Sequence, residues 1–451
     1  MKIFQILARP FIAFVERYYP DAFIFVIILS VITFFSALIL TNATPSSALL
    51  AWGDGLSMLF TFTAQITIIM IGAHSLAHTE SVQNFLTRIG QLPNSAYQAY
   101  ALVAFTAGIA SLCAWSFGLI IGAIMARSVA RECLKKPFKI HYPLLVASAY
   151  SGYVIWHMGY SSSSALFVAT PGHLLEDKIG VIPVTETILS PTNIVLALIA
   201  LATITIICPL MKPKDEDTIE IDPELLKDNH QKPENRKNKM TLIEKFENHR
   251  SLSIFLSVAI FTYIAVTYTQ RGFSLTLDFV SWTFLAFGLL LANSPMHYIK
   301  LVNKAAGTVG PIILQYPFYS GIMGVMATTG LMKVISDWII SIATPETLGF
   351  FAFLSGGLIN MFVPSGGGQW AVQGPIMIEA ALSLNVEPAI VVLGVAYGDQ
   401  WSNMIQPFWL IPILAITGLR MRQVLGYTFV IFLFTGIIYG SGILYMGSGY
   451  N

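Results

Sequence analysis

Charged side chains are scarce in this 451-residue chain: Asp, Glu, Lys and Arg make up 11% of it, whereas hydrophobic residues make up 55%. An ordinary soluble domain carries roughly 25% charged residues, so a water-soluble globule of this length would lack the charge to cover its surface. The net charge of +1 gives no field that would attract nucleic acid. We therefore expect an all-α integral membrane protein whose surroundings are the lipid bilayer, with no nucleic-acid partner.

Cysteines and enzyme motifs are also missing. The three cysteines, Cys113, Cys133 and Cys208, lie far apart and in no metal-binding spacing, which excludes a disulfide scaffold and a zinc site. There is no GxSxG, HExxH, P-loop or dinucleotide fingerprint, so we expect neither an enzyme nor a bound organic cofactor. Any transport would then be driven by an ion gradient or by the gradient of the substrate itself.

Long apolar runs dominate what is present. They lie near residues 22–40, 56–77, 96–126, 142–174, 187–211, 252–269, 276–292, 305–332, 347–383, 388–419 and 424–446. The first is long enough to span a bilayer, and we interpret it as a retained helix and not as a removed signal peptide. Several others exceed the roughly 20 residues that one span needs and contain Gly, Pro or Ser near their middle. We predict about 10–12 transmembrane or re-entrant helical segments, some of them broken at membrane depth.

One stretch, residues 212–250, interrupts the hydrophobic pattern. It holds 19 of the 49 formal charges and is predicted to be an aqueous linker without a site. It divides the chain into a first membrane repeat, 1–211, and a second, 251–451. The side of the membrane on which this linker lies stays open, because its charges nearly cancel.

Short basic loops suggest an orientation. Residues 127–139 hold five basic side chains against one acid, Glu132, which favours the cytoplasm. Lys2, Arg9 and Arg17 place the amino terminus on the same side.

The two halves share a weak internal repeat. Shifting the sequence by 204 positions aligns residues 151–171 with 355–375, and six of the 21 aligned pairs are identical. The alignment superposes one cluster of small residues on another. A small-residue break repeated in each half is typical of the binding site in inverted-repeat transporters, so we predict two inverted repeats of broken helices.

The strongest candidate site is the run 362–370, which reads FVPSGGGQW. Three glycines after a proline are expected to break a membrane helix, and irregular backbone in the hydrocarbon region is tolerated where it lines a cavity. The free N–H groups that follow would suit a carboxylate. We predict substrate contacts from Ser365, Gly366, Gly367, Gly368 and Gln369.

The matching cluster in the first half is a run of four serines. Alone, such serines pack helices or bond back to the preceding turn, but their position in the repeat favours substrate binding by Ser161, Ser162, Ser163 and Ser164. His157 lies just upstream and titrates near neutral pH, so it is a candidate proton relay; a structural histidine is an equal alternative.

A third element surrounds Asp399, the only formal charge between Glu387 and Arg420. A carboxylate inside an apolar segment costs about 2.5–3.5 kcal/mol on insertion scales and usually faces a cavity or a partner. No neighbouring Lys or Arg can neutralise it, which suggests a bound sodium ion or proton, with Ser402 and Asn403 as oxygen ligands. The alternative is a helix end at the water interface.

Two further elements combine aromatic residues with a helix breaker or a small residue. We interpret residues 315–321 as another helix break at a proline, and their composition resembles that of residues 406–409. Residues 115–118 are interpreted as a similar interruption in the first half, at the tip of a hairpin. An aromatic lining would suit a small carboxylate with a short alkyl tail, although core packing explains these aromatics equally well.

These motifs carry a resemblance. The run 363–375, together with 398–403 and the opening 16–21, resembles the bacterial short-chain fatty acid transporter family over the whole chain. The resemblance implies an inner-membrane carrier for short-chain fatty acids such as acetoacetate and butyrate. The family belongs to a superfamily of inverted-repeat carriers, commonly dimers, in which a scaffold holds a moving domain with hairpin tips. The resemblance further implies that 161–164 and 365–369 lie at such tips or at helix breaks, with Asp399 and Asn403 beside them.

The sequence therefore predicts a symporter that couples a small monocarboxylate to a proton or another cation. A carrier for another organic acid, such as a dicarboxylate, and a passive channel are the alternatives. A dicarboxylate would favour a second fixed positive charge, which is missing near these motifs. Substrate chain length, the coupling ion, transport direction and oligomeric state stay open.

Overall fold

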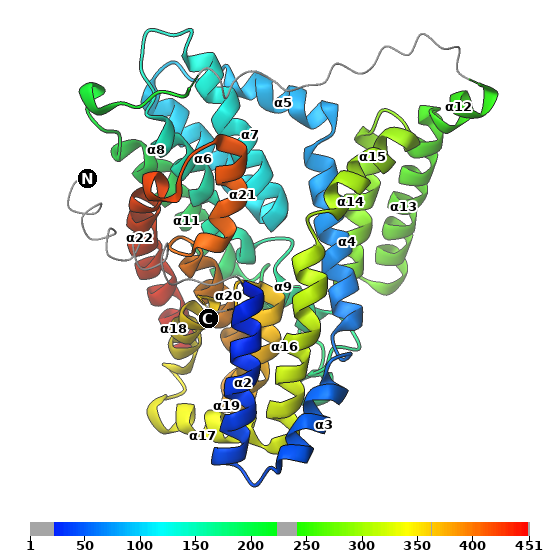
Figure 1. Ribbon diagram of the computed structural model, residues 1–451, viewed down its shortest axis with the longest axis vertical. Coiled ribbons are helices and arrows are strands. Elements are labelled where there is room, and N and C mark those ends of the chain that lie inside the picture. The colour runs from blue at the N-terminus through cyan, green and yellow to red at the C-terminus, as the bar shows by residue number, and fades with distance from the viewer. Residues whose placement is uncertain (1–21, 223–240, 362, 450–451) are drawn as a thin grey trace.

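The computed structural model describes residues 22–222, 241–361 and 363–449 (Figure 1). Over these ranges the chain is helical and contains no strand, so the prediction of an all-α membrane protein is confirmed. The opening motif 16–21, the basic residues before it and linker residues 223–240 lie outside the described residues.

The helices follow one another along the chain with short connections. They are α2 (Ala22–Leu40), α3 (Pro45–Gly55), α4 (Phe60–Ala77), α5 (Glu80–Gly90), α6 (Ala96–Cys113), α7 (Trp115–Cys133), α8 (Tyr142–Ser151), η1 (Gly152–Met158), α9 (Ser163–Ala169), α10 (Glu176–Ile179), η2 (Val184–Glu186), α11 (Pro191–Leu210), η3 (Asp215–Asp217), α12 (Leu242–Glu247), α13 (Arg250–Arg271), α14 (Leu277–Leu291), α15 (Pro295–Ala306), α16 (Gly310–Thr329), α17 (Leu331–Ile342), α18 (Leu348–Asn360), α19 (Gly366–Ser383), α20 (Pro388–Ser402), α21 (Pro407–Thr417) and α22 (Met421–Gly447).

Several of these helices can cross a bilayer. Within the described ranges, five apolar helices are long enough: Phe60–Ala77, Ala96–Cys113, Pro191–Leu210, Leu242–Arg271 and Met421–Gly447. A sixth candidate is the pair α16 and α17, which bends by 80° at Gly330. Four shorter apolar helices of 10–17 residues accompany them, as expected for a protein with part-spanning and broken segments.

A helical hairpin lies in the described part of each half of the chain. Helices α6 and α7 turn back at Ala114, whose backbone is extended. Helices α18 and α19 run antiparallel, because Gln369 Nε2 donates to the Gly356 carbonyl at 2.9 Å and Gln373 Nε2 donates to Ser355 Oγ at 2.9 Å. Figure 1 shows the first hairpin in the upper part of the molecule and the second in the lower part, which is the arrangement that an inverted repeat requires.

Each hairpin is followed by a broken helix. In the first half α8 tightens into η1, stops at residues 159–162 and resumes as α9; in the second half α20 stops at 403–406 and resumes as α21. The short helix after each break packs against the other half of the chain. Helix α9 of the first half packs against α19 and α20, and α21 of the second half packs against α7 and α8. This packing places both breaks in the interior, between the two hairpins.

The predicted repeat register is wrong, although a break exists at both places. The 204-residue shift aligned the broken helix at 159–162 with the hairpin tip at 361–365. Packing instead relates α6 and α7 to α18 and α19, and α8 with η1 to α20, because α8 and η1 pack on α6 as α20 packs on α18. Small residues serve close packing at every break, so a local match between small-residue clusters does not identify equivalent elements.

Two predicted helix breaks are also corrected. Helix α16 continues through Pro317 without interruption, since a membrane helix can satisfy the lost hydrogen bond by local adjustment. Gly366, Gly367 and Gly368 are not the break; they form the first turn of α19, and the non-helical residues described before it are 363–365.

A second group of helices covers one side of the hairpins. Helix α16 packs on α2, α3 and α4, and α4 packs on α14 and α15. The approach is close, because a Cβ on Gly55 would lie 2.9 Å from the Ser320 carbonyl oxygen. Helix α4 also touches the hairpin arm α7, and α16 touches the hairpin arm α19, so the two helices form the wall opposite the breaks.

The described start of the linker is docked and not simply solvated. The Tyr142 N–H donates to the Ile219 carbonyl at 2.8 Å, and the Ile219 N–H donates to His141 Nδ1 at 3.0 Å. Ile221 is buried. This segment therefore fastens to the beginning of α8.

Candidate functional site

A cavity of about 450 Å³ lies between the hairpin tips and the wall formed by α4 and α16. Its lining is Ile66, Met70, His74, Trp115, Ser116, Leu119, Ile120, Tyr153, Trp156, Ser163, Thr308, Pro311, Ile312, Gln315, Tyr316, Pro364, Ser365, Gly366, Phe408, Trp409, Ile411, Pro412 and Ile416. Among the described residues, the lining includes no Lys, Arg, Asp or Glu. Such a mostly apolar pocket with a few polar groups is typical of a small-molecule site.

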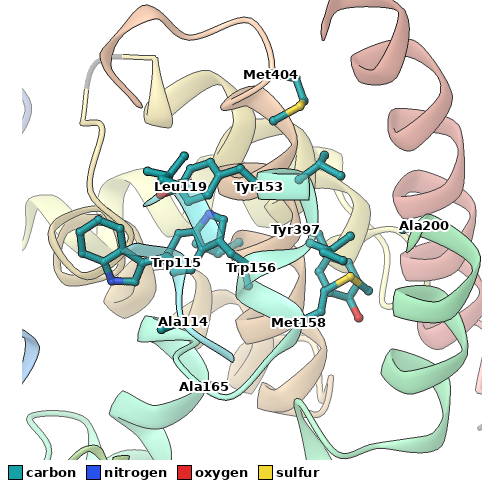
Figure 2. Close-up of a cluster of buried hydrophobic side chains, with 14 of the residues drawn as sticks. Ala114, Trp115, Leu119, Tyr153, Trp156, Met158, Ala165, Ala200, Tyr397 and Met404 are labelled. Carbon is teal, nitrogen blue, oxygen red and sulfur yellow. The ribbon is translucent and has the colours of Figure 1, made fainter. Parts of the chain in front are cut away.

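Aromatic rings form much of the inner surface. Figure 2 shows Trp115, Tyr153 and Trp156 gathered around one point. The Tyr153 ring centroid lies 5.8 Å from that of Trp156 and 6.0 Å from that of Trp409, which in turn lies 5.0 Å from that of Trp115. These residues come from the first hairpin, η1 and α21, so both halves of the chain contribute to one aromatic cluster.

The tip of the second hairpin reaches the cavity through Ser365. Its hydroxyl accepts the Gly368 N–H at 3.3 Å and donates to the Tyr316 hydroxyl at 2.9 Å. Ser365 therefore caps α19 and joins the hairpin to α16. Both Ser365 and Gly366 line the cavity, as the prediction that they contact substrate requires.

The three glycines allow side chains from other helices to approach. A Cβ on Gly366 would lie 2.6 Å from His157 Nε2, and one on Gly367 would lie 2.5 Å from a Phe62 ring carbon. A Cβ on Gly368 would lie 2.6 Å from the Tyr319 ring. No real Cβ tolerates such distances, so glycine is required here for close approach and not to break the helix.

The four serines of the first half have different surroundings. Ser161 Oγ accepts the Trp115 N–H at 3.1 Å, and Ser162 Oγ lies 3.1 Å from His157 Nδ1. Ser163 lines the cavity, and Ser164 Oγ is buried without a hydrogen-bond partner. Of the four serines, Ser163 is the one that lines the cavity and could contact a ligand there.

Gln369 lies outside the cavity lining. Its side chain is fully buried and donates to the Gly356 carbonyl, and it also donates to Gln373 Oε1 at 3.0 Å. These bonds hold the two arms of the second hairpin together. The position of Gln369 indicates that it stabilises the hairpin. The direct contact with substrate predicted for Gln369 remains a prediction.

The structure brings His157 and Asp399 together. His157 Nε2 lies 3.4 Å from Asp399 Oδ2, and the two side chains are 1% and 2% exposed. Neither atom has a hydrogen-bond partner among the described residues. His157 and Asp399 lie far apart in the sequence, so the sequence did not reveal that they are neighbours. The sequence analysis therefore treated the His157 imidazole as a candidate separate from the Asp399 carboxylate.

Polar groups surround this pair. Asn403 Nδ2 lies 3.5 Å from Asp399 Oδ1, while Asn403 Oδ1 accepts the Trp156 indole N–H at 3.0 Å. Ser402 Oγ bonds to the carbonyls of its own helix and accepts from Asn360 Nδ2 at 2.8 Å. Over the described ranges, no three His, Cys, Asp or Glu side chains converge as a metal cluster would require.

A smaller cavity of about 150 Å³ lies on the other side of an aromatic wall. Phe62 and Phe167 line this smaller cavity, and Tyr316 lines the larger one. The Phe62 ring lies 5.2 Å from Phe167 and 6.0 Å from Tyr316 between centroids. We call these three rings the aromatic wall; the sequence pointed to one of them, Tyr316 in the stretch 315–321, and gave no signal for Phe62 or Phe167.

Comparison with known proteins identifies the family. Residues 3–446 match the family model described as short chain fatty acid transporter. A provisionally named short-chain fatty acid transporter of Escherichia coli (strain K12) is 37% identical over 437 residues, which cover 97% of this chain and 98% of the relative. One of Haemophilus influenzae, also provisionally so named, is 34% identical over 447 residues, covering 98% and 99%.

Solved structures support the fold. The crystal structure of the Alcanivorax borkumensis YdaH transporter matches with a TM-score of 0.62 at 12% identity and covers 96% of this chain and 99% of that chain. MtrF of Neisseria gonorrhoeae, from a class of antimetabolite efflux pumps, matches with a TM-score of 0.50 at 13% identity and 97% coverage of both chains. The resemblance seen in the sequence is thus confirmed: this multi-pass membrane protein belongs to the short-chain fatty acid transporter family.

Proposed function

We propose that this protein carries short-chain monocarboxylates, such as acetoacetate and butyrate, across the bacterial inner membrane by way of the aromatic cavity. The observation that carries the proposal is the cavity itself, whose aromatic and aliphatic lining is interrupted by a few hydroxyl groups. Its volume of about 450 Å³ leaves room for an acid with a short tail. The apolar lining suits the alkyl chain, and the hydroxyls suit the carboxylate.

The second hairpin offers the carboxylate a favourable electrostatic environment. Helix α19 is 18 residues long and begins at the cavity, so its amino-terminal N–H groups carry partial positive charge. Ser365 caps this end, and Ser163 lies in the same lining. This arrangement supports the predicted substrate contacts of both serines.

Transport is coupled to a cation, either sodium or a proton, at Asp399. Its carboxylate is buried beside His157 and has one oxygen without a hydrogen-bond partner. A buried acid of this kind is typically functional in membrane proteins. Ser402 and Asn403 support the site, and His157 is the candidate relay. Co-transport of one cation with one monocarboxylate makes the process electroneutral.

Two alternatives make different predictions. A dicarboxylate carrier would need a second fixed positive charge, and none of the described lining residues is Lys or Arg. A passive channel would give flux that does not saturate. The amino terminus is proposed to lie in the cytoplasm, from the basic residues near the start and in 127–139, and a homodimer is proposed from the family resemblance.

Uptake of labelled butyrate and acetoacetate into proteoliposomes of the purified protein tests the proposal. Proton and sodium gradients are imposed separately, and protein-free liposomes measure the leak of undissociated acid through the lipid. Saturable uptake stimulated by one gradient supports the carrier and identifies the ion. Uptake of butyrate at the protein-free rate, with acetoacetate excluded, would refute the assignment of cargo.

A further inference from the structure

We propose that the hydroxyls of Ser116 and Tyr153 donate the hydrogen bonds that hold the carboxylate of the transported acid. The inference rests on the proposed function, because it concerns the same cavity, but it adds two residues that the sequence motifs did not identify as binding groups.

Both hydroxyls are buried and have no partner. Ser116 is 4% exposed and Tyr153 is 1% exposed. Among the described residues, neither hydroxyl oxygen has a hydrogen-bond partner. Buried polar groups in native proteins are nearly always satisfied, and an exception calls for a ligand, an ion or a water. Because both residues line the same cavity, one ligand can satisfy both.

The two hydroxyls belong to elements that meet at the break of the first half. Ser116 lies in the first turn of α7, immediately after the hairpin turn at Ala114. Tyr153 lies on η1, where its ring packs between Trp156 and Trp409. This stacking holds the phenol ring in one orientation, so little conformational freedom is lost when a ligand binds beside it. Ser163 and Ser365 add hydroxyl groups from both halves of the chain, and the remaining polar lining includes His74, Thr308 and Gln315.

The charge of these hydroxyl groups defines the ligand class. Hydroxyl groups donate to an anionic oxygen without adding a charge of their own. A single carboxylate on an apolar chain matches the lining, whereas a second carboxylate would enter an apolar surface with no cation among the described lining residues and would be costly to bury. We therefore infer that the site takes acids with a single carboxylate.

Binding measurements on the purified full-length protein test the inference. Titration with butyrate is followed by tryptophan fluorescence, since Trp115, Trp156 and Trp409 line the cavity. Ser116→Ala and Tyr153→Phe each remove an oxygen that has no partner within the described protein, so the melting temperature should stay at the wild-type value. Each variant should raise the dissociation constant by about tenfold, the usual value of a hydrogen bond to a charged group.

Ser111→Ala is the matched control. Ser111 is also fully buried with an unpartnered hydroxyl, but it lies on α6 outside the cavity lining. Its dissociation constant for butyrate should equal that of the wild type. Butyramide, which replaces the carboxylate by a neutral amide, should bind more weakly than butyrate in the wild type.

Four outcomes would overturn the inference. They are unchanged butyrate affinity in both variants, an equal loss in Ser111→Ala, equal binding of butyramide, and a large fall in melting temperature, which would show that the hydroxyls have partners in the protein. Failure of the wild-type protein to bind butyrate or acetoacetate would instead refute the proposed function, so the two failures are distinguishable.

Discussion

Replacing Gly366 by alanine adds one methyl group at the point where the second hairpin touches η1. The added Cβ would lie 2.6 Å from His157 Nε2 and 2.6 Å from Trp156 Cη2. Carbon atoms normally pack at about 3.5–4.0 Å, so both rings would have to retreat by about 1 Å. Both rings are held in place, because the Trp156 indole N–H donates to Asn403 Oδ1 and the imidazole Nδ1 of His157 lies 3.1 Å from Ser162 Oγ.

The magnitude follows from two opposing terms. Overpacking a tight interior costs about 1–3 kcal/mol, while alanine in place of glycine in a helix returns at most about 1 kcal/mol. We expect a net destabilisation of about 1–2 kcal/mol, seen as a lower melting temperature. Transport should fall much further, by about a hundredfold, because a 1 Å displacement of positioning groups can cost that much.

Gly53→Ala is the matched control. Gly53 lies on α3, has no atom within 4 Å of its added Cβ and is not among the positive-φ glycines. This variant should transport at the wild-type rate and melt at the same or a slightly higher temperature. Butyrate uptake into proteoliposomes and thermal melting of both variants measure the effect. Wild-type uptake and melting in Gly366→Ala would refute the reasoning that this contact shapes the site.

Further variants test the coupling site, the hairpin, the wall and the linker. Asp399→Asn should abolish gradient-driven uptake while exchange across the membrane survives; unchanged driven uptake would remove Asp399 from coupling. Gly367→Val should insert normally into the membrane but lose butyrate binding, because its side chain would meet Phe62 and Tyr316; binding at the wild-type affinity would contradict this. Phe62→Ala should open the aromatic wall and give saturable butyrate efflux without an imposed gradient, and efflux that stays gradient-dependent would show that the wall does not gate. Burial lowers the pKa of His141 to about 4 from its ordinary 6.5, so docking of the linker on the neutral imidazole is fully present above about pH 6.5 and weakens as the pH falls toward 4. The protection factors of the amides of residues 219–221, which correct the hydrogen-exchange rate for its intrinsic pH dependence, should fall between pH 7 and pH 5, and constant protection factors would exclude His141 as the cause.

The sequence predicted the features that depend on composition. Scarce charge and long apolar runs identified a helical membrane protein, and clusters of small and polar residues indicated interruptions near 161–164 and 362–370. Asp399 stood out because an isolated charge in an apolar run is rare, and the structure does bury it.

The features that depend on packing could not be predicted. A hairpin tip and a broken helix both contain small residues, so the repeat was aligned in the wrong register. His157 and Asp399 meet through the crossing of η1 and α20, which no local pattern reports. The stretch 115–118 stood out in the sequence as a tip, but nothing in it marked the hydroxyl of Ser116, and Tyr153 is an ordinary residue in an apolar stretch; their hydroxyls stand out through the absence of partners in the folded protein.

The aromatic wall has a consequence for chain-length selection. Phe62, Phe167 and Tyr316 come from α4, α9 and α16, so passage from the larger cavity to the smaller one requires movement between three separate helices. An acid with a short alkyl tail can pass the three rings with its tail and carboxylate together. A long tail would remain wedged between them after the carboxylate has crossed and would prevent the rings from closing. We therefore expect medium-chain acids to bind in the larger cavity with good affinity yet to translocate slowly, so that discrimination by length is kinetic and such acids act as competitive inhibitors.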